Sequence, residues 1–369
     1  MRPTVTELRW RDPPLAAIDT PKGRLRLTLS VGSGLSRRAG DTAGRVWGLG
    51  DRGPNMKVKV ARQRYGLEHL KPLKDLAGAK ILPLPDFQPL LAELQVGPER
   101  VELVRTLPLR TLAAPFSGRP LPGGDSAEME PTFDLDGQPL ATDVAGCDPE
   151  GVAALADGGF WVAEEYGPSL LRVGPDGVVT ARWNPQGLAL PGAEQRLPAA
   201  ALRRRLNRGF EGVCVSGDEL WLYAVFQSAL EGDGLLATTI WKLDARDGTL
   251  AASYAYPFDP TASFRRDAAA GEAKADDLKV CELVWLGPDR LLVLERMSRD
   301  ARLYTVELNG PAPLAKTQVF STDDHPEVAP DLEGAALLSD RELLLATDND
   351  FGTEGAETRF YRLTWDAPL

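Results

Sequence analysis

Four glutamates recur at comparable places in the sequence, each at the start of a short apolar run. Three of them are followed directly by glycine, and successive members lie 61, 71 and 51 residues apart. The four are Glu150, Glu211, Glu282 and Glu333. If the runs that follow them are equivalent strands, their carboxylates meet at one place in the fold.

A second set of polar residues closes a second apolar run in each segment, and one further pair lies near residue 50. In two consecutive antiparallel strands, the start of the first lies beside the end of the second. Both sets are therefore expected on one face. The second set comprises Asp51, Arg52, Glu164, Glu165, Gln227, Glu295, Arg296, Asp348, Asn349 and Asp350.

Carboxylates that converge repel one another, so such a cluster either keeps some members protonated or binds a cation. The expected donors are all oxygens, which favours Ca²⁺ and, in second place, Mg²⁺. The predicted metal ligands are Asp51, Glu150, Glu211, Glu282, Glu295, Glu333, Asp348 and Asp350. The alternative is structural, because a carboxylate at a strand start can accept backbone N–H bonds from a neighbouring element.

Three arginines lie next to these acids in the sequence: Arg52, Arg208 and Arg296. A guanidinium can hold two oxygens of a phosphate or carboxylate, so we expect these side chains to bind a departing anion. A salt bridge to the adjacent acids is the alternative. Glu164 or Glu165, free of metal, is the predicted general base.

A repeated unit must position these residues. Four segments, beginning at Asp148, Phe210, Val280 and Asp331, share an apolar run, a turn rich in Gly, Asp or Pro, and a second apolar run. Runs of five to seven residues bounded by turn residues are typical of strands, and further strand patterns follow each pair. A fifth copy begins near residue 24.

Four-stranded units repeated in this way predict an all-β protein, a β-propeller of five or six blades in a single domain over residues 1–369. A sixth blade would have to use the N-terminal run TVTELRW. Residues 53–90 and 113–147 interrupt the pattern. They are expected to be loop insertions on one face, where function is usually found.

The composition suits a globular β protein. Hydrophobic residues make up 43% of the chain, and 36 glycines and 30 prolines favour many tight turns. The net charge of −11 argues against binding to nucleic acid. The basic run at residues 57–64 is the local exception, expected to be a solvated loop face, with a binding patch as the alternative. No apolar stretch reaches the length of a membrane span.

The three cysteines, Cys147, Cys214 and Cys281, are far apart and odd in number, which argues against a disulfide framework or a zinc motif. The first residues lack the apolar stretch of a signal peptide, so we expect a cytoplasmic protein. A trimmed signal would instead mean a secreted or periplasmic one. The sequence predicts no oligomeric state.

Taken in order, several motifs resemble those of the phytase-like family, described as having esterase-like activity of phytase. They span the chain from about residue 28 to the C-terminus and are Asp148–Gly151, Phe160–Pro168, Asn207–Gly212 with Gln227-Ser228, Leu291–Arg296, Leu332–Gly334 and Asp348–Gly352. The resemblance implies a β-propeller and calcium-assisted hydrolysis of phosphomonoesters.

The chain departs from that family's pattern in two places and in its composition. Cys281-Glu282-Leu283 stands where relatives carry Asp-Leu after a serine, and Ser33-Gly34 lacks the usual doubled glycine. The chain also has few lysines, whereas propeller phytases line their phosphate site with several.

The leading hypothesis is a hydrolase that depends on Ca²⁺ or Mg²⁺ and acts on a phosphate ester or a similar small anionic ester. One alternative is a lactonase-like propeller hydrolase. The other is a non-catalytic binding propeller whose acidic residues hold a structural metal ion. Fold analogy does not separate these three, because propellers host many functions.

Overall fold

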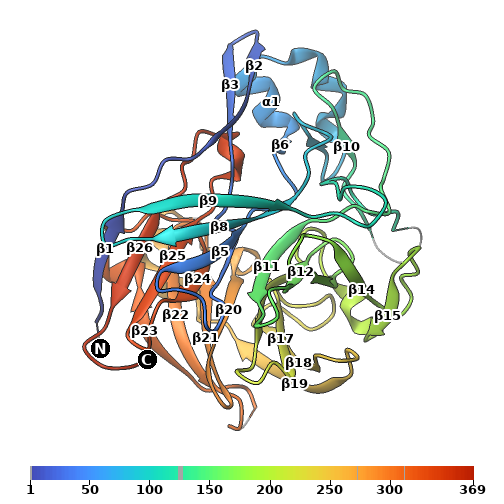
Figure 1. The fold of residues 1–369 in the computed structure, drawn as a ribbon. Coiled ribbons are helices and arrows are strands. Elements are labelled where there is room, and N and C mark those ends of the chain that lie inside the picture. Colours follow the sequence, from blue (N-terminus) through green and yellow to red (C-terminus); the bar gives the residue numbers. More distant parts are fainter. Residues whose placement is uncertain (1, 124–127, 272, 311) are drawn as a thin grey trace.

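Antiparallel sheets arranged around a common axis make up most of the structure, a computed structural model that describes residues 2–123, 128–271, 273–310 and 312–369 (Figure 1). The first sheet contains β4 (Gly34–Ser36), β5 (Arg45–Leu49), β8 (Leu90–Val96) and β9 (Val101–Pro108). The second contains β11 (Pro149–Ala154), β12 (Phe160–Glu164), β13 (Ser169–Val173), β14 (Val179–Pro185) and the parallel strand β15 (Glu194–Leu197).

The third sheet contains β16 (Phe210–Val215), β17 (Trp221–Phe226), β18 (Ala237–Asp244) and β19 (Leu250–Pro257). The fourth contains β20 (Lys279–Gly287), β21 (Arg290–Arg296), β22 (Ala301–Glu307) and β23 (Lys316–Ser321). The fifth contains β24 (Leu332–Leu337), β25 (Glu342–Thr347), β26 (Phe360–Thr364) and β1 (Thr4–Leu8).

The first strand of each sheet faces the axis. These inner strands contact one another in the order β4, β11, β16, β20 and β24, and β24 returns to β4. The predicted all-β propeller is therefore confirmed, and it has five blades. The N-terminal run considered for a sixth blade forms β1, which pairs antiparallel with β26 from Thr4↔Thr364 to Leu8↔Phe360. The two ends of the chain thus close the ring within one blade.

Apolar and aromatic side chains fill the spaces between the blades. Trp47 of the first sheet packs against Phe160 of the second with ring centroids 4.7 Å apart. Trp161 and Trp241, expected to be core residues, are 4% and 3% exposed. The tight turn before β14 uses Gly177, whose φ of +80° suits glycine.

The segment at residues 53–90 lies between β5 and β8 and contains β6 (Met56–Lys57), α1 (Val58–Tyr65), the 3-10 helix η1 (Glu68–Asp75) and β7 (Lys80–Ile81). The segment at residues 113–147 contributes β10 (Thr132–Phe133), which pairs in parallel with β7; its residues 124–127 lie outside the described part of the chain. The hairpin β2 (Pro14–Thr20) and β3 (Gly23–Thr28) lies beside them, above the propeller (Figure 1).

We call the hairpin β2–β3 and residues 53–90 the cap. The cap has a hydrophobic core of its own, to which Phe133 is added. The other helical segments are α2 (Arg265–Ala270) and the 3-10 helices η2 (Ala199–Arg203), η3 (Thr261–Ser263), η4 (Ala275–Asp277), η5 (Thr322–Asp324) and η6 (Asp350–Gly352). Within the described ranges, none of the helices has the length and apolarity needed to cross a membrane.

The closure of the ring by β1 predicts a specific loss of stability. Leu8 is 2% exposed and packs in the core between the fifth and first blades. Leu8→Ala should lower the free energy of unfolding by about 2–5 kcal/mol, because it leaves a cavity there. Thr6→Ala, an exposed position of the same strand, should stay within about 0.5 kcal/mol. Urea unfolding measures both, and equal effects would contradict this role of β1.

Candidate functional site

Four of the five inner strands contain a β-bulge at the end where the second strand finishes. The register shifts between Pro149 and Gly151, Phe210 and Gly212, Val280 and Glu282, and Leu332 and Gly334. A bulge leaves one residue without a partner on the neighbouring strand and redirects its side chain. The bulged residues are Glu150, Glu211, Cys281 and Glu333. We call this end of the propeller the mouth.

The predicted place of Glu282 is therefore wrong by one residue, since Cys281 holds the bulge position in the fourth blade. Glu282 stands where the other blades have glycine, and it is 1% exposed. Its carboxylate accepts the N–H groups of Leu283 and of Leu35, each at 3.0 Å, and so reaches across the axis to the first blade. Burial raises its pKa well above the usual value, while these amides oppose the shift. Glu282 therefore has the structural role considered as the alternative to metal binding, since its carboxylate accepts backbone N–H bonds.

Glu164 and Glu295 also lie away from the mouth, contrary to expectation, and both are fully buried. The carboxylate of Glu164 accepts bonds from Tyr166 N and Ser169 Oγ, both at 2.7 Å. Neighbouring residues of a strand point to opposite faces, so Glu165 remains at the mouth while Glu164 points into the blade.

Glu295 takes the same inward direction in the fourth blade. Its carboxylate accepts bonds from Tyr256 Oη at 2.7 Å and from Lys316 Nζ at 2.6 Å. Burial is the largest influence on its pKa, which is raised, although Lys316 opposes this. The arrangement is a closed network inside the blade and leaves no group for a ligand at the mouth.

Asp51 connects two groups of carboxylates at the mouth. One oxygen of each residue lies within 4.8 Å of the others in the group Asp51, Asp148 and Glu150 and in the group Asp51, Asp348 and Asp350. We call these five residues the acidic site. Asp148 was not predicted, although Asp148-Pro149-Glu150-Gly151 and Asp331-Leu332-Glu333-Gly334 repeat an acid two residues before the glutamate.

Local turns position the acidic site. Asp51 directly follows Gly50 after β5 and accepts the N–H of Gly53 at 3.0 Å. Asp348 follows β25 and accepts bonds from Ser30 Oγ and from Asn349 N. Asp350 has a φ of +46°.

Phe351, the next residue, has a φ of +54°, which is costly for a bulky side chain. It is 1% exposed and packs against Phe87 of the cap with ring centroids 5.0 Å apart. The cap thus helps to hold the strained turn that carries Asp348 and Asp350.

Burial and like charge disfavour ionisation at this site. Burial raises the pKa of Asp51 well above its usual value, and the charge of Asp148 adds to the shift. The pKa of Glu150 is raised by burial, then by Asp148 and Glu211. Burial and Glu333 raise that of Asp348. A bound cation would relieve this repulsion.

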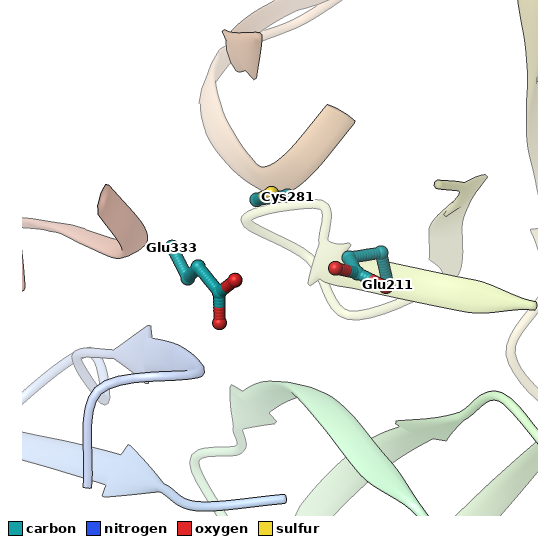
Figure 2. A group of neighbouring side chains, drawn as sticks. All are labelled: Glu211, Cys281 and Glu333. Carbon is teal, nitrogen blue, oxygen red and sulfur yellow. The ribbon is translucent and has the colours of Figure 1, made fainter. Parts of the chain in front are cut away.

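A second group at the mouth consists of Glu211, Cys281 and Glu333, which we call the thiol site. One ligand atom of each lies within 4.8 Å of the others. In Figure 2 the carboxylates of Glu211 and Glu333 face each other, with the Cys281 sulfur to one side. Burial and the charge of Glu333 raise the pKa of Glu211 to about 7.

Of the three arginines predicted to hold an anion, Arg52 is engaged inside the protein. Its guanidinium contacts Glu130 Oε2 at 2.6 Å, Tyr166 Oη at 2.8 Å and Asn207 Oδ1 at 2.6 Å, and it is 3% exposed. Its Nε lies 3.2 Å from Asp148 Oδ2. Arg52 therefore forms salt bridges inside the protein, which was the alternative to binding an anion.

Arg296 is likewise held by neighbouring acids. Its Nη1 lies 2.8 Å from Asp331 Oδ1, its Nη2 pairs with Glu333, and its Nε donates to Cys281 Sγ at 3.2 Å. Arg208 differs, because it lines an open cavity; its Nη1 donates to the Leu278 carbonyl at 3.3 Å.

That cavity lies between the cap and the mouth and has a volume of about 450 Å³. Its cationic side chains are Arg208 and five of the chain's ten lysines. These lysines are Lys57, Lys59, Lys74 and Lys80 of the cap and Lys279 of β20. The first two belong to the basic run expected to be a solvated loop face; both are exposed, but the run forms the end of β6 and most of α1 and is not a loop. The shortage of lysines is therefore offset locally by where the cap places them.

Side chains that line the cavity lie next to those of the mouth. Gln227 lines the cavity and donates from Nε2 to Glu211. The charges of Glu211 and Glu165 both act on Arg208. The carboxylates of the mouth thus lie next to the cationic side chains of the cavity. This arrangement suits a metal cation at the mouth with a bound anion beside it in the cavity.

The fold and this site define a five-bladed propeller with an acidic mouth under a cap. The sequence model of the phytase-like family, described as esterase-like activity of phytase, matches residues 31–351. The chain belongs to this family.

Other likenesses are weaker. An uncharacterized secreted protein of Arthroderma benhamiae is 30% identical over 105 residues, 24% of this chain and 20% of that protein, so the match spans a fifth of that relative. The PQQ-bound aldose sugar dehydrogenase of Streptomyces coelicolor is 11% identical over 98% of both chains, with a TM-score of 0.39. An exo-β-1,3-galactanase of Phanerochaete chrysosporium is 11% identical over 99% of this chain and 66% of its own, with a TM-score of 0.44. Such scores say nothing of this chain's activity.

Glu282 should matter for stability and not for metal binding. Glu282→Ala removes the acceptor of buried amides and should lower the free energy of unfolding by about 1–3 kcal/mol. The rise in melting temperature on adding Ca²⁺ should be unchanged. Thermal melting with and without Ca²⁺ tests this, and loss of the Ca²⁺ response in a folded variant would return Glu282 to the ligand set.

The raised pKa of Glu211 predicts how the metal-free protein responds to pH. Its pKa of about 7 in the folded chain exceeds the usual 4.5, so its stabilising effect is present below pH 4.5 and is lost as the pH rises through 7. In EDTA, the free energy of unfolding of the unsubstituted protein should fall between pH 5 and pH 8 relative to that of Glu211→Gln. Parallel pH profiles would contradict the raised pKa.

Proposed function

We propose that this chain is a metal-dependent hydrolase of a phosphate ester or a similar small anionic ester, with Ca²⁺ as its cation and Mg²⁺ as the alternative. The observation that carries the proposal is the cationic cavity opening beside the acidic mouth. Membership of a family described by esterase-like activity supports hydrolysis as the reaction class.

The acidic site fits a hard cation. Its donors, from Asp51, Asp148, Glu150, Asp348 and Asp350, are all carboxylate oxygens, which Ca²⁺ prefers. Asp148 Oδ2 is buried and makes no hydrogen bond in the described structure, although Arg52 Nε is 3.2 Å away. When bound, the ion supplies Lewis-acid chemistry that polarises the ester and activates water.

Arg208 and Lys279 would bind the substrate's anionic group. Both line the cavity, one from the loop before β16 and the other from the first residue of β20. Charged donors at such a place bind the anionic group of the substrate and of the transition state alike. The cap lysines would hold the outer part of the same anion.

Glu165 is the general base in this proposal, since Glu164 is saturated by donors. It is 2% exposed, and its Oε2 accepts the N–H of Gly209 at 3.3 Å. Burial, then the charges of Asp148 and Glu211, raises its pKa well above 4.5. A carboxylate with a raised pKa accepts a proton from water more readily near neutral pH. Glu165 would hold that proton and return it to the departing alcohol.

Asp51 contributes to both carboxylate groups of the acidic site, so Asp51→Asn should weaken Ca²⁺ binding by at least about tenfold. With Ca²⁺ at a hundredfold excess over its dissociation constant, the unsubstituted protein should gain about 2.7 kcal/mol of stability. Turnover of p-nitrophenyl phosphate should fall with the affinity. Asp366→Asn, an exposed acid near the C-terminus, is the matched control.

The substrate class is tested in the same assays. Lys279→Gln should raise KM for the phosphate ester with a smaller change in kcat, whereas Lys71→Gln, exposed and outside the cavity, should change neither. Lactone turnover without phosphatase activity would select the lactonase-like alternative. Ca²⁺ binding without turnover of phosphate esters, carboxylic esters or lactones would overturn the proposed hydrolase and leave a binding protein.

A further inference from the structure

The thiol site differs in chemistry from the acidic site, because a sulfur atom takes the place of a carboxylate. Glu211, Cys281 and Glu333 come from the consecutive inner strands β16, β20 and β24, and all three occupy the bulge position. One ligand atom of each lies within 4.8 Å of the others. Backbone geometry, not chance contact of long side chains, thus brings them together (Figure 2).

A second observation points to a ligand at this place. Glu211 is 3% exposed, and its Oε2 has no hydrogen-bond partner in the described structure. Its Oε1 accepts the bond from Gln227 Nε2. A buried carboxylate oxygen without a partner is costly, and in Figure 2 the Glu211 carboxylate is turned toward Glu333.

The charges around the site leave room for a divalent cation. With the thiol deprotonated, Glu211, Cys281 and Glu333 carry three negative charges, and the single charge of Arg296 is shared between Glu333 and Asp331. Lys279 is a further cation whose charge acts on both glutamates. A divalent ion would reduce the repulsion among the three ligands.

We propose that Glu211, Cys281 and Glu333 form a second metal site, selective for a borderline transition ion such as Zn²⁺. Thiolate ligands disfavour Ca²⁺ and Mg²⁺, whereas Zn²⁺ accepts sulfur and carboxylate oxygen together. Three protein ligands leave a fourth position open to water or substrate. The site does not depend on the proposed hydrolase activity or on Ca²⁺ at the acidic site.

Binding would involve proton release and no change in oxidation state. As the bond between Sγ and the metal forms, the S–H bond breaks and its proton leaves to solvent. Burial raises the pKa of the Cys281 thiol, so the free protein holds the proton until the ion displaces it. Arg296 Nε, 3.2 Å from Sγ, would remain as the outer partner that orients the sulfur.

Co²⁺ is a suitable probe, because it replaces Zn²⁺ and shows a thiolate-to-metal charge-transfer absorption only when sulfur is a ligand. Titration of the full chain with Co²⁺ in saturating Ca²⁺ should give this absorption at one ion per chain, and Zn²⁺ should abolish it. Cys281→Ser should remove the absorption. Cys214→Ser, a buried cysteine of β16 outside the site, should retain it.

Glu333→Gln keeps the sulfur and should weaken Co²⁺ binding at least tenfold, which keeps the test valid if Cys281→Ser fails to fold. The Ca²⁺-dependent rise in melting temperature should persist in every folded variant, so failure at one metal site is distinguishable from failure at the other. Absence of the charge-transfer absorption in the unsubstituted protein, or its persistence in Cys281→Ser, would overturn the proposal.

Discussion

Five inner strands approach one another so closely around the axis that only glycine fits at most of the contacts between them. A Cβ on Gly34 would lie 2.6 Å from the Glu150 carbonyl oxygen, and one on Gly151 would lie 2.6 Å from that of Glu211. In β11 and β16 the residue before the glycine, Glu150 or Glu211, lies at a bulge that turns its side chain toward the mouth. Close packing of backbones therefore dictates that the bulged side chains gather in a small space. The charges and hydrogen bonds at the mouth depend on that crowding.

The crowding of carboxylates at the mouth also has an electrostatic consequence. Buried carboxylates of like charge raise one another's pKa, and the fold compensates part of this with internal arginines. Arg52 pairs with Glu130 and Asp148, and Arg296 pairs with Glu333. The arginines do not fully compensate the burial of Asp51 and the charge of Asp148 beside it, so the pKa of Asp51 stays raised. A bound cation would relieve this repulsion.

The fold was predictable because its signals are local. Short apolar runs, turn residues and a recurring acid are enough to indicate strands, repeats and a common face. Blade number was not predictable, because β1 joins β26 across the whole length of the chain. In the fourth blade a one-residue bulge brings Cys281, and not Glu282, to the mouth. A strict alternation of strand residues does not reveal such a bulge.

The cap shows the same limit in another way. The sequence predicts a solvated face for the basic run that contains Lys57 and Lys59, because a charge pattern carries no information on what lies opposite. Only the packing of residues 57–80 near Arg208 and Lys279 turns them into part of one cavity. Asp148, in contrast, could have been predicted from the sequence. Asp148 and Asp331 each lie two residues before a bulged glutamate, which is a repeated pattern.

A crystal structure of the protein grown with Ca²⁺ and inorganic phosphate tests the central claim most directly. We expect an ion with carboxylate oxygens of Asp51 and its neighbours at about 2.3–2.6 Å, and a phosphate in the cavity near Arg208 and Lys279. A mouth without an ion under saturating Ca²⁺, its carboxylates bonded only to one another and to water, would contradict the account.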